Sequence, residues 1–168
     1  DNGIEMEANA ALSKRFGDNA HINVTSFNQK VLLTGEAKDA DIKGEAGAYV
    51  KAMKNARTVF NEIVIGPNST YTARANDSYL ESKIKTQMIF TDKLPSNSMS
   101  IVAEGASVYL MGVLTQNEAD LAKKVASNTN GVKDVYVYFD IISDAEKNRL
   151  EKQGKADESQ PNSPPKFQ

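Results

Sequence analysis

The sequence predicts an α+β protein built from two tandem αββαβ modules, each a three-stranded mixed sheet with two helices packed on one face. Three observations predict this fold. A helix, a β-hairpin, a second helix and a strand follow one another twice along the 168 residues. The segment VLLTG at 31–35 matches VYLMG at 108–112, and NARTVFN at 55–61 matches GVKDVYV at 131–137. The two spacings differ by one residue, which a single deletion in the intervening helix explains.

The first module is expected over residues 4–66. Ile4 and Leu12 lie on one face of a helix, because apolar residues there recur at helical spacing. Asn28 and Gln29 form a hairpin turn between two alternating strands, and Asp39 is a suitable N-cap for the second helix. The predicted elements are a helix at 4–16, strands at 20–27 and 30–35, a helix within 38–53 and a strand at 57–65.

A linker at 67–73 joins this unit to the second module, which is expected over residues 74–142. Its predicted elements repeat the same order, with helices at 74–90 and 117–128 and strands at 98–105, 107–114 and 133–142. From 143 to 168 the composition becomes polar and proline-rich, with few apolar groups to offset the entropy of ordering. We therefore expect a short helical extension after Ser143 and a largely disordered tail.

Charge and composition exclude several classes of protein. The net charge is −2, and the chain contains no dense basic stripe of the kind that phosphate recognition requires, so no nucleic-acid partner is expected. Without cysteine there are no disulfides, thiolate nucleophiles or cysteine-ligated metals. No apolar run approaches the roughly 18 to 20 residues that span a bilayer. Because the chain opens almost directly into a helix, we expect an export segment upstream of residue 1.

Two glycine-containing motifs are present, the first in both copies and the second in the second copy alone. V-x-L-x-G ends the second strand of each copy, at Val31, Leu33 and Gly35 and again at 108–112, and G-V-x-x-V opens the last strand of the second copy at Gly131. An αββαβ unit with these motifs resembles the BON domain. The first copy departs from the second motif, with asparagine and alanine at 55 and 56, which favours a differently built helix exit.

The tandem arrangement over residues 4 to about 142 resembles the dual-BON outer-membrane lipoproteins of Gram-negative bacteria. That resemblance implies a periplasmic protein anchored to the outer membrane by an N-terminal lipid, on a cysteine that this sequence lacks. It also implies binding of anionic phospholipid membranes through the second domain, and a part in envelope integrity and at the division site. Envelope or division proteins are further partners that the resemblance suggests.

The helix expected at 74–90 has two apolar faces. Leu80, Ile84 and Met88 form a normal core-facing stripe. On the opposite side Ala75, Tyr79, Ser82, Thr86 and Ile89 recur at spacings of 4, 3, 4 and 3, where a small two-layer domain should present polar groups to water. The corresponding face of the first helix has no aromatic residue. We expect lipid to be bound by Tyr79, Lys83, Thr86, Ile89 and Phe90.

Two alternatives remain for this face. Tyr79 and Phe90 could pack against the first domain or against the chain after Ile141, or they could bind an envelope or division protein without lipid. Three lysines at 83, 85 and 93 would favour an anionic surface, whereas acidic residues at 77, 81 and 92 would oppose it. Full burial of one aromatic ring contributes about 1.5 to 3 kcal/mol and each lysine about 1 kcal/mol, so binding by this helix alone should be weak and reversible.

Catalysis is not expected from this sequence. His21 is the only histidine, so neither a catalytic triad nor a histidine metal site has companions. Asp39, Asp41 and Glu45 lie near a helix start, where they complement the helix dipole. Neither Gly35 nor Gly112 belongs to a phosphate-binding loop. We therefore predict no catalytic residue, no cofactor and no metal site.

Overall fold

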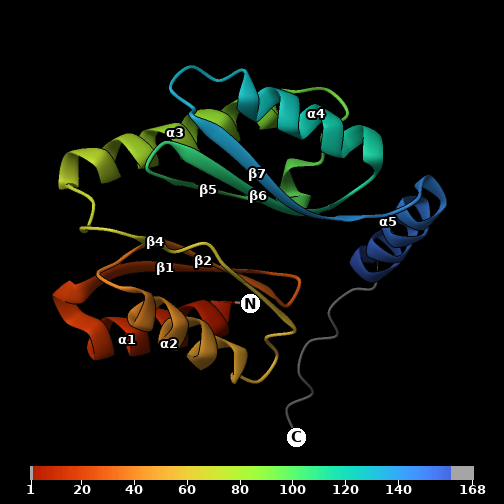
Figure 1. Ribbon diagram of the computed structural model, residues 1–168. Coiled ribbons are helices and arrows are strands. Elements are labelled where there is room, and N and C mark those ends of the chain that lie inside the picture. Colours follow the sequence, from red (N-terminus) through yellow and green to blue (C-terminus); the bar gives the residue numbers. More distant parts are fainter. Residues whose placement is uncertain (1, 160–168) are drawn as a thin grey trace, which may run out of the picture.

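The computed structural model describes residues 2–159 and contains two modules of the same topology followed by a helix (Figure 1). The first module comprises α1 (Asn2–Phe16), η1 (Gly17–Asn19), β1 (Ala20–Phe27), β2 (Lys30–Ala37), α2 (Ala40–Lys51), β3 (Thr58–Asn61) and β4 (Val64–Ile65). The second comprises α3 (Tyr71–Ile89), η2 (Ser96–Ser98), β5 (Met99–Glu104), β6 (Ser107–Leu114), α4 (Gln116–Ser127) and β7 (Asp134–Ile141). The final helix is α5 (Asp144–Ser159).

The two sheets share one pattern of strand pairing. In each, a hairpin pairs two antiparallel strands, β1 with β2 and β5 with β6, and the last strand then joins in parallel. β7 pairs with β6 along its whole length, from Ser107 opposite Asp134 to Leu114 opposite Ile141. The predicted α+β fold, with two αββαβ modules, mixed sheets and two helices on one face of each, is confirmed.

The last strand of the first module differs from the single strand predicted at 57–65. It is divided into β3 and β4, which pair with different parts of β2. Between them the side chain of Ile63 is buried at 1% exposure in the helix-facing core, and Asn61 Oδ1 accepts a hydrogen bond from the Ile63 amide. Burial of Ile63 and this local bond accompany the interruption.

Side-chain caps fix where the helices begin. Asp39 Oδ1 accepts from the Ile42 amide at 2.9 Å, which confirms the predicted N-cap of α2. Thr70 caps α3 in the same way, through the Ala73 amide, so that α3 begins at Tyr71, three residues before the predicted start. Thr115 begins α4 with a reciprocal capping box.

The helix exit of the first module is not built differently, and that prediction is wrong. Asn55 adopts a φ of 74°, and Gly131 at the matching point of the second module has a φ of 96°, so both residues have a positive φ. Asparagine tolerates this left-handed conformation better than most residues with a side chain. The substitution therefore preserves the turn.

Each module has a core between its helices and its sheet. In the first module the buried set is Ile4, Ala8, Leu12, Phe16, Val24, Val31, Leu33, Ala37, Ala46, Val50 and Ile63. In the second it is Leu80, Ile84, Met88, Leu94, Ile101, Ala103, Val108, Leu110, Leu114, Ala119, Ala122 and Ala126. Side chains that alternate along β2 and β6 supply one wall of each core.

A third cluster, the sheet interface, joins the two modules. It contains Leu32 from β2, Val102 from β5, and Tyr109 and Met111 from β6, with Phe27, Phe60 and Tyr138 packed against them. The Phe60 and Tyr138 ring centroids lie 4.7 Å apart, within the range for aromatic pairs. The two sheets thus face each other, and the helices form the outer layers (Figure 1).

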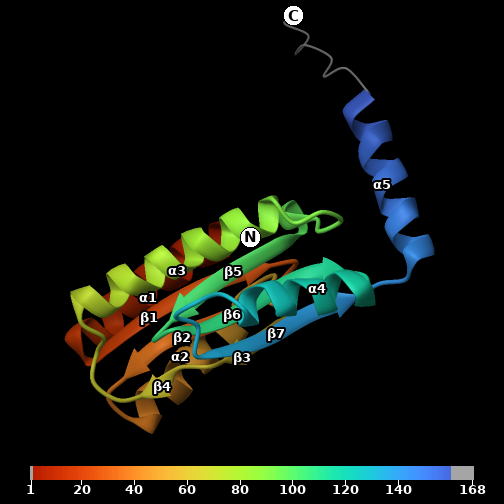
Figure 2. The same cartoon turned by 90° about the horizontal axis from the view of Figure 1, so that it is seen from above.

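The helix α5 is longer than the short extension predicted within 143–168. It runs over 16 residues and extends away from both modules (Figure 2). Ser143 Oγ accepts from the Glu146 amide at its start, and Arg149 forms an ion pair with Glu146 one turn later. Each of these local bonds adds a small stabilisation to a helix with few apolar residues. The disorder predicted beyond it falls on residues 160–168, which lie outside the described residues.

Candidate functional site

The face of α3 that points away from the sheets is the candidate site. The inner face of this helix is buried in the core of the second module: Leu80, Ile84 and Met88 are at most 2% exposed. The sheet interface occupies the opposite side of the β5–β6–β7 sheet, so it leaves the outer face of α3 uncovered (Figure 1). Any partner of that face must come from outside the described part of the chain.

Three of the predicted lipid-binding residues are large apolar side chains in open solvent. Tyr79, Ile89 and Phe90 are 62%, 59% and 84% exposed. Tyr79 and Phe90 therefore do not pack against the first module or against the described chain after Ile141. Exposed apolar groups gathered on one face mark an interaction surface more often than isolated ones do.

The two remaining predicted residues lie on the same helix surface. The Lys83 ammonium is 5.9 Å from the centroid of the Tyr79 ring, a cation–π distance. Thr86 is exposed, and its hydroxyl donates to the Ser82 carbonyl at 2.9 Å. The structure thus places all five predicted residues along one surface of the helix, with Lys83 half-buried and the other four exposed. We call this surface the α3 outer face.

Sequence reasoning missed Tyr71, which is 88% exposed at the first position of α3. At 100° per residue, Tyr71 projects in the same direction as Ile89 and within about 80° of Tyr79. The guanidinium of Arg74 lies 5.6 Å from the centroid of its ring. The signal for this residue was Thr70, a threonine able to cap a helix starting at the next position.

Two of the three acidic residues expected to oppose an anionic surface are at least partly buried. Asp77 is buried, and its carboxylate accepts the Gly105 and Ala106 amides at 2.9 Å, which fixes the β5–β6 turn. Burial raises the pKa of Glu81. Of these three residues, only Asp92 is exposed.

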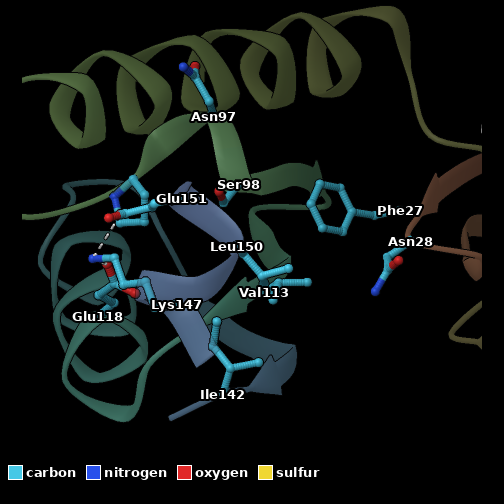
Figure 3. Close-up of a pocket in the computed structure, with 11 residues that line it drawn as sticks. Phe27, Asn28, Asn97, Ser98, Val113, Glu118, Ile142, Lys147, Leu150 and Glu151 are labelled. Atoms are coloured by element: carbon cyan, nitrogen blue, oxygen red, sulfur yellow. Dashed lines mark hydrogen bonds and ion pairs between the residues drawn. The ribbon is translucent and has the colours of Figure 1, made fainter. Parts of the chain in front are cut away.

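A separate cavity of about 680 Å³ lies at the base of α5 (Figure 3). Phe27, Val113, Ile142 and Leu150 are among the residues that line it. At its edge the Lys147 ammonium contacts a Glu118 carboxylate oxygen at 2.6 Å. This cavity shares no lining residue with the α3 outer face.

Within residues 2–159, no helix combines the length and the apolar character needed to cross a membrane.

Comparison with known proteins identifies the two modules. A family model of the BON domain matches residues 1–67 and again residues 76–142. The Haemophilus influenzae outer membrane lipoprotein DolP is 29% identical over 142 residues, covering 84% of this chain and 70% of that protein. The 21 kDa hemolysin of Actinobacillus pleuropneumoniae is 28% identical over 134 residues, covering 80% of this chain and 69% of that protein.

Among solved structures, the alignment with CdsD, a structural protein of the type III secretion system of Chlamydia trachomatis, covers 89% of this chain and 68% of that chain. Its sequence identity is 14% and its TM-score is 0.34, too low to imply a shared fold.

The duplicated αββαβ fold and the two family matches make this chain a member of the BON-domain family. It is a dual-BON protein of the DolP type, since its two BON domains follow in tandem and most of its length aligns with DolP.

Proposed function

We propose that this chain is a periplasmic envelope-integrity protein whose second BON domain docks on anionic phospholipid through the α3 outer face. Tyr79 and Phe90 insert their rings, Ile89 adds apolar area, Thr86 permits close approach and Lys83 contacts head groups. Tyr71 extends the same contact toward the start of the helix. One observation carries the proposal: large apolar side chains stand exposed on this face, and the Lys83 ammonium lies beside one of them.

The physical chemistry of a membrane interface suits these residues. A tyrosine ring is stable at the boundary between water and hydrocarbon, and lysine stems can reach outward to phosphates. From Tyr71 to Ile89 the helix is about 27 Å long at 1.5 Å per residue, so its aromatic residues can touch a membrane at both ends.

Membership of the BON family and the likeness to DolP support an envelope location. A lipid anchor preceding residue 1, as that likeness implies, would hold the protein at the outer membrane. Because single weak signals give only reversible binding, such an anchor and the α3 outer face would act together. No chemical reaction is proposed.

Vesicle sedimentation tests the proposal with the unanchored chain. The chain should pellet with vesicles containing phosphatidylglycerol, less with phosphatidylcholine alone, and less again at high salt, because salt screens the lysines. Tyr79→Ala and Phe90→Ala should each weaken binding roughly tenfold or more, corresponding to about 1.5 to 3 kcal/mol of lost apolar burial.

Matched controls separate a membrane contact from general damage. Tyr49→Ala removes a tyrosine that is 38% exposed on α2 of the first module and should leave vesicle binding unchanged. Lys83→Gln should weaken binding, whereas Lys123→Gln on α4 should not. Unchanged sedimentation of Tyr79→Ala and Phe90→Ala would instead support the alternative, in which the protein is an interaction scaffold for envelope or division proteins without lipid.

A further inference from the structure

His21 has companions that its position in the sequence conceals. It lies on β1, opposite Glu36 of β2 in the antiparallel register, and its Nδ1 is 3.0 Å from Glu36 Oε2. Glu104, at the end of β5 in the second module, approaches the same point. One potential ligand atom from each of these three residues lies within 4.8 Å of the other two.

Both modules hold this cluster in place. Glu104 Oε1 accepts hydrogen bonds from the first module, from Asn23 Nδ2 and from Thr34 Oγ1. β5 lies over β1 in both views of the molecule (Figures 1 and 2). The three side chains are half-buried, so their geometry is set by two packed sheets rather than by a mobile loop.

The cluster carries excess negative charge beside a hollow. A cavity of about 200 Å³ is lined by His21, Asn23, Arg74, Asp77, Ser78, Glu81, Ala103 and Glu104. Within the cluster, a carboxylate oxygen of Glu36 and one of Glu104 lie within 4.8 Å of each other. Arg74 lines the hollow, but its Nε donates to Ser69 Oγ at 3.0 Å. A cation placed between the carboxylates would relieve their repulsion.

We propose that His21, Glu36 and Glu104 form a site for a divalent transition-metal ion of the Zn²⁺ type that joins the two BON domains. One imidazole and two carboxylates match the nitrogen and oxygen ligands that Zn²⁺ accepts, and the hollow has room for water as a fourth ligand. Asn23 is the outer partner that orients Glu104. This site lies on other residues than the α3 outer face and goes beyond the proposed function.

Isothermal titration of the tag-free chain with Zn²⁺ tests this site. The wild type should bind one ion saturably, and Zn²⁺ should raise its thermal midpoint because the ion binds only the assembled pair of domains. His21→Ala and Glu104→Gln should each weaken Zn²⁺ binding more than tenfold and abolish the thermal shift. Asn23→Ala should weaken it by about 10- to 100-fold.

Glu81→Gln is the matched control, since Glu81 lines the same hollow but is not one of the three ligands. It should change Zn²⁺ affinity less than threefold. Equal loss in Glu81→Gln and Glu104→Gln, unchanged Zn²⁺ binding in His21→Ala, or Mg²⁺ binding as tightly as Zn²⁺ would each overturn the proposal. Vesicle sedimentation of His21→Ala should match the wild type, so failure here is distinguishable from failure of the lipid-binding proposal.

Discussion

At the scale of single residues, Gly35 shows why the V-x-L-x-G motif ends in glycine. Its φ is +114°, and a Cβ built there would lie 1.9 Å from the carbonyl oxygen of His21 on the paired strand. Gly112 occupies the equivalent place in the second module, where a Cβ would lie 2.7 Å from the Ser98 carbonyl oxygen. Both hairpins therefore need a residue without a side chain where their strands approach.

We expect Gly35→Ala to lower the free energy of unfolding by at least about 2 kcal/mol, since it adds both backbone strain and a clash with the backbone of β1. Gly44→Ala is the matched control, because Gly44 lies inside α2 with no atom within 4 Å of its added Cβ. It should stabilise the protein by about 0.5 to 1 kcal/mol through helix propensity. Urea unfolding measures both. Equal effects would refute the role assigned to Gly35.

At the scale of elements, α5 is fastened to the second BON domain through Glu118 of α4. Glu118 Oε1 accepts the Thr115 amide and completes the capping box, while its Oε2 accepts from the Lys147 ammonium. Burial acts against ionisation, but the hydrogen bonds from Lys147 and Thr115 prevail and hold the pKa of Glu118 below its usual value. One carboxylate therefore serves two helices.

Two substitutions at this position separate its two roles. Glu118→Gln should keep the capping bond and lose the charged contact, so the α5 amides should exchange hydrogen faster while α4 stays protected. Glu118→Ala should lose both and destabilise α4 by a further 1 kcal/mol or so. Folding lowers the pKa of Glu118. The stability that the charged Glu118 contributes is therefore present above the ordinary carboxyl pKa and is lost as the pH falls through the lowered value. Hydrogen exchange at neutral and acid pH measures the effects of the two substitutions and of pH. Unaltered exchange of the α5 amides in Glu118→Gln would contradict the role of the Lys147–Glu118 contact in holding α5.

The elements were largely predictable from the sequence because their signals are local. Apolar periodicity predicted α1 and α3. Asn28 and Gln29 form the predicted hairpin turn, and both residues have backbone angles in the left-handed region. The start of α3 was missed because Thr70 sits among residues typical of a linker, and Tyr71 was lost with it. The cluster around His21 was invisible for another reason: Glu104 is 83 residues away in sequence and reaches His21 only when the sheets pack.

At the scale of the whole molecule, face-to-face packing of the sheets was not predicted, although the sequence contains its signature. VLLTG and VYLMG are nearly continuous apolar runs, which is typical of strands buried on both faces. Leu32 and Met111 are 0% and 1% exposed on the side away from the helices. Periodicity shows that a second face is apolar, but it does not identify what covers that face.

This packing has a consequence for tyrosine ionisation. Burial in the sheet interface, together with the nearby charge of Glu62, raises the pKa of Tyr109 to about 12, and burial raises that of Tyr138 as well. The neutral phenol is thus favoured in the folded protein. The resulting stability is fully present below the ordinary tyrosine pKa near 10 and is lost as the pH rises through the raised value.

We therefore expect the free energy of unfolding to fall between about pH 10 and 12 as the two BON domains are driven to expose these phenols. Tyr109→Phe keeps the ring and removes one ionisable group, so its stability should fall less steeply over that interval than that of the wild type. Tyr79→Phe, at an exposed position on α3, is the control and should follow the wild type. Urea unfolding at several alkaline pH values measures the slopes. If Tyr109→Phe lost stability as steeply as the wild type, ionisation of Tyr109 would not be what loosens the sheet interface.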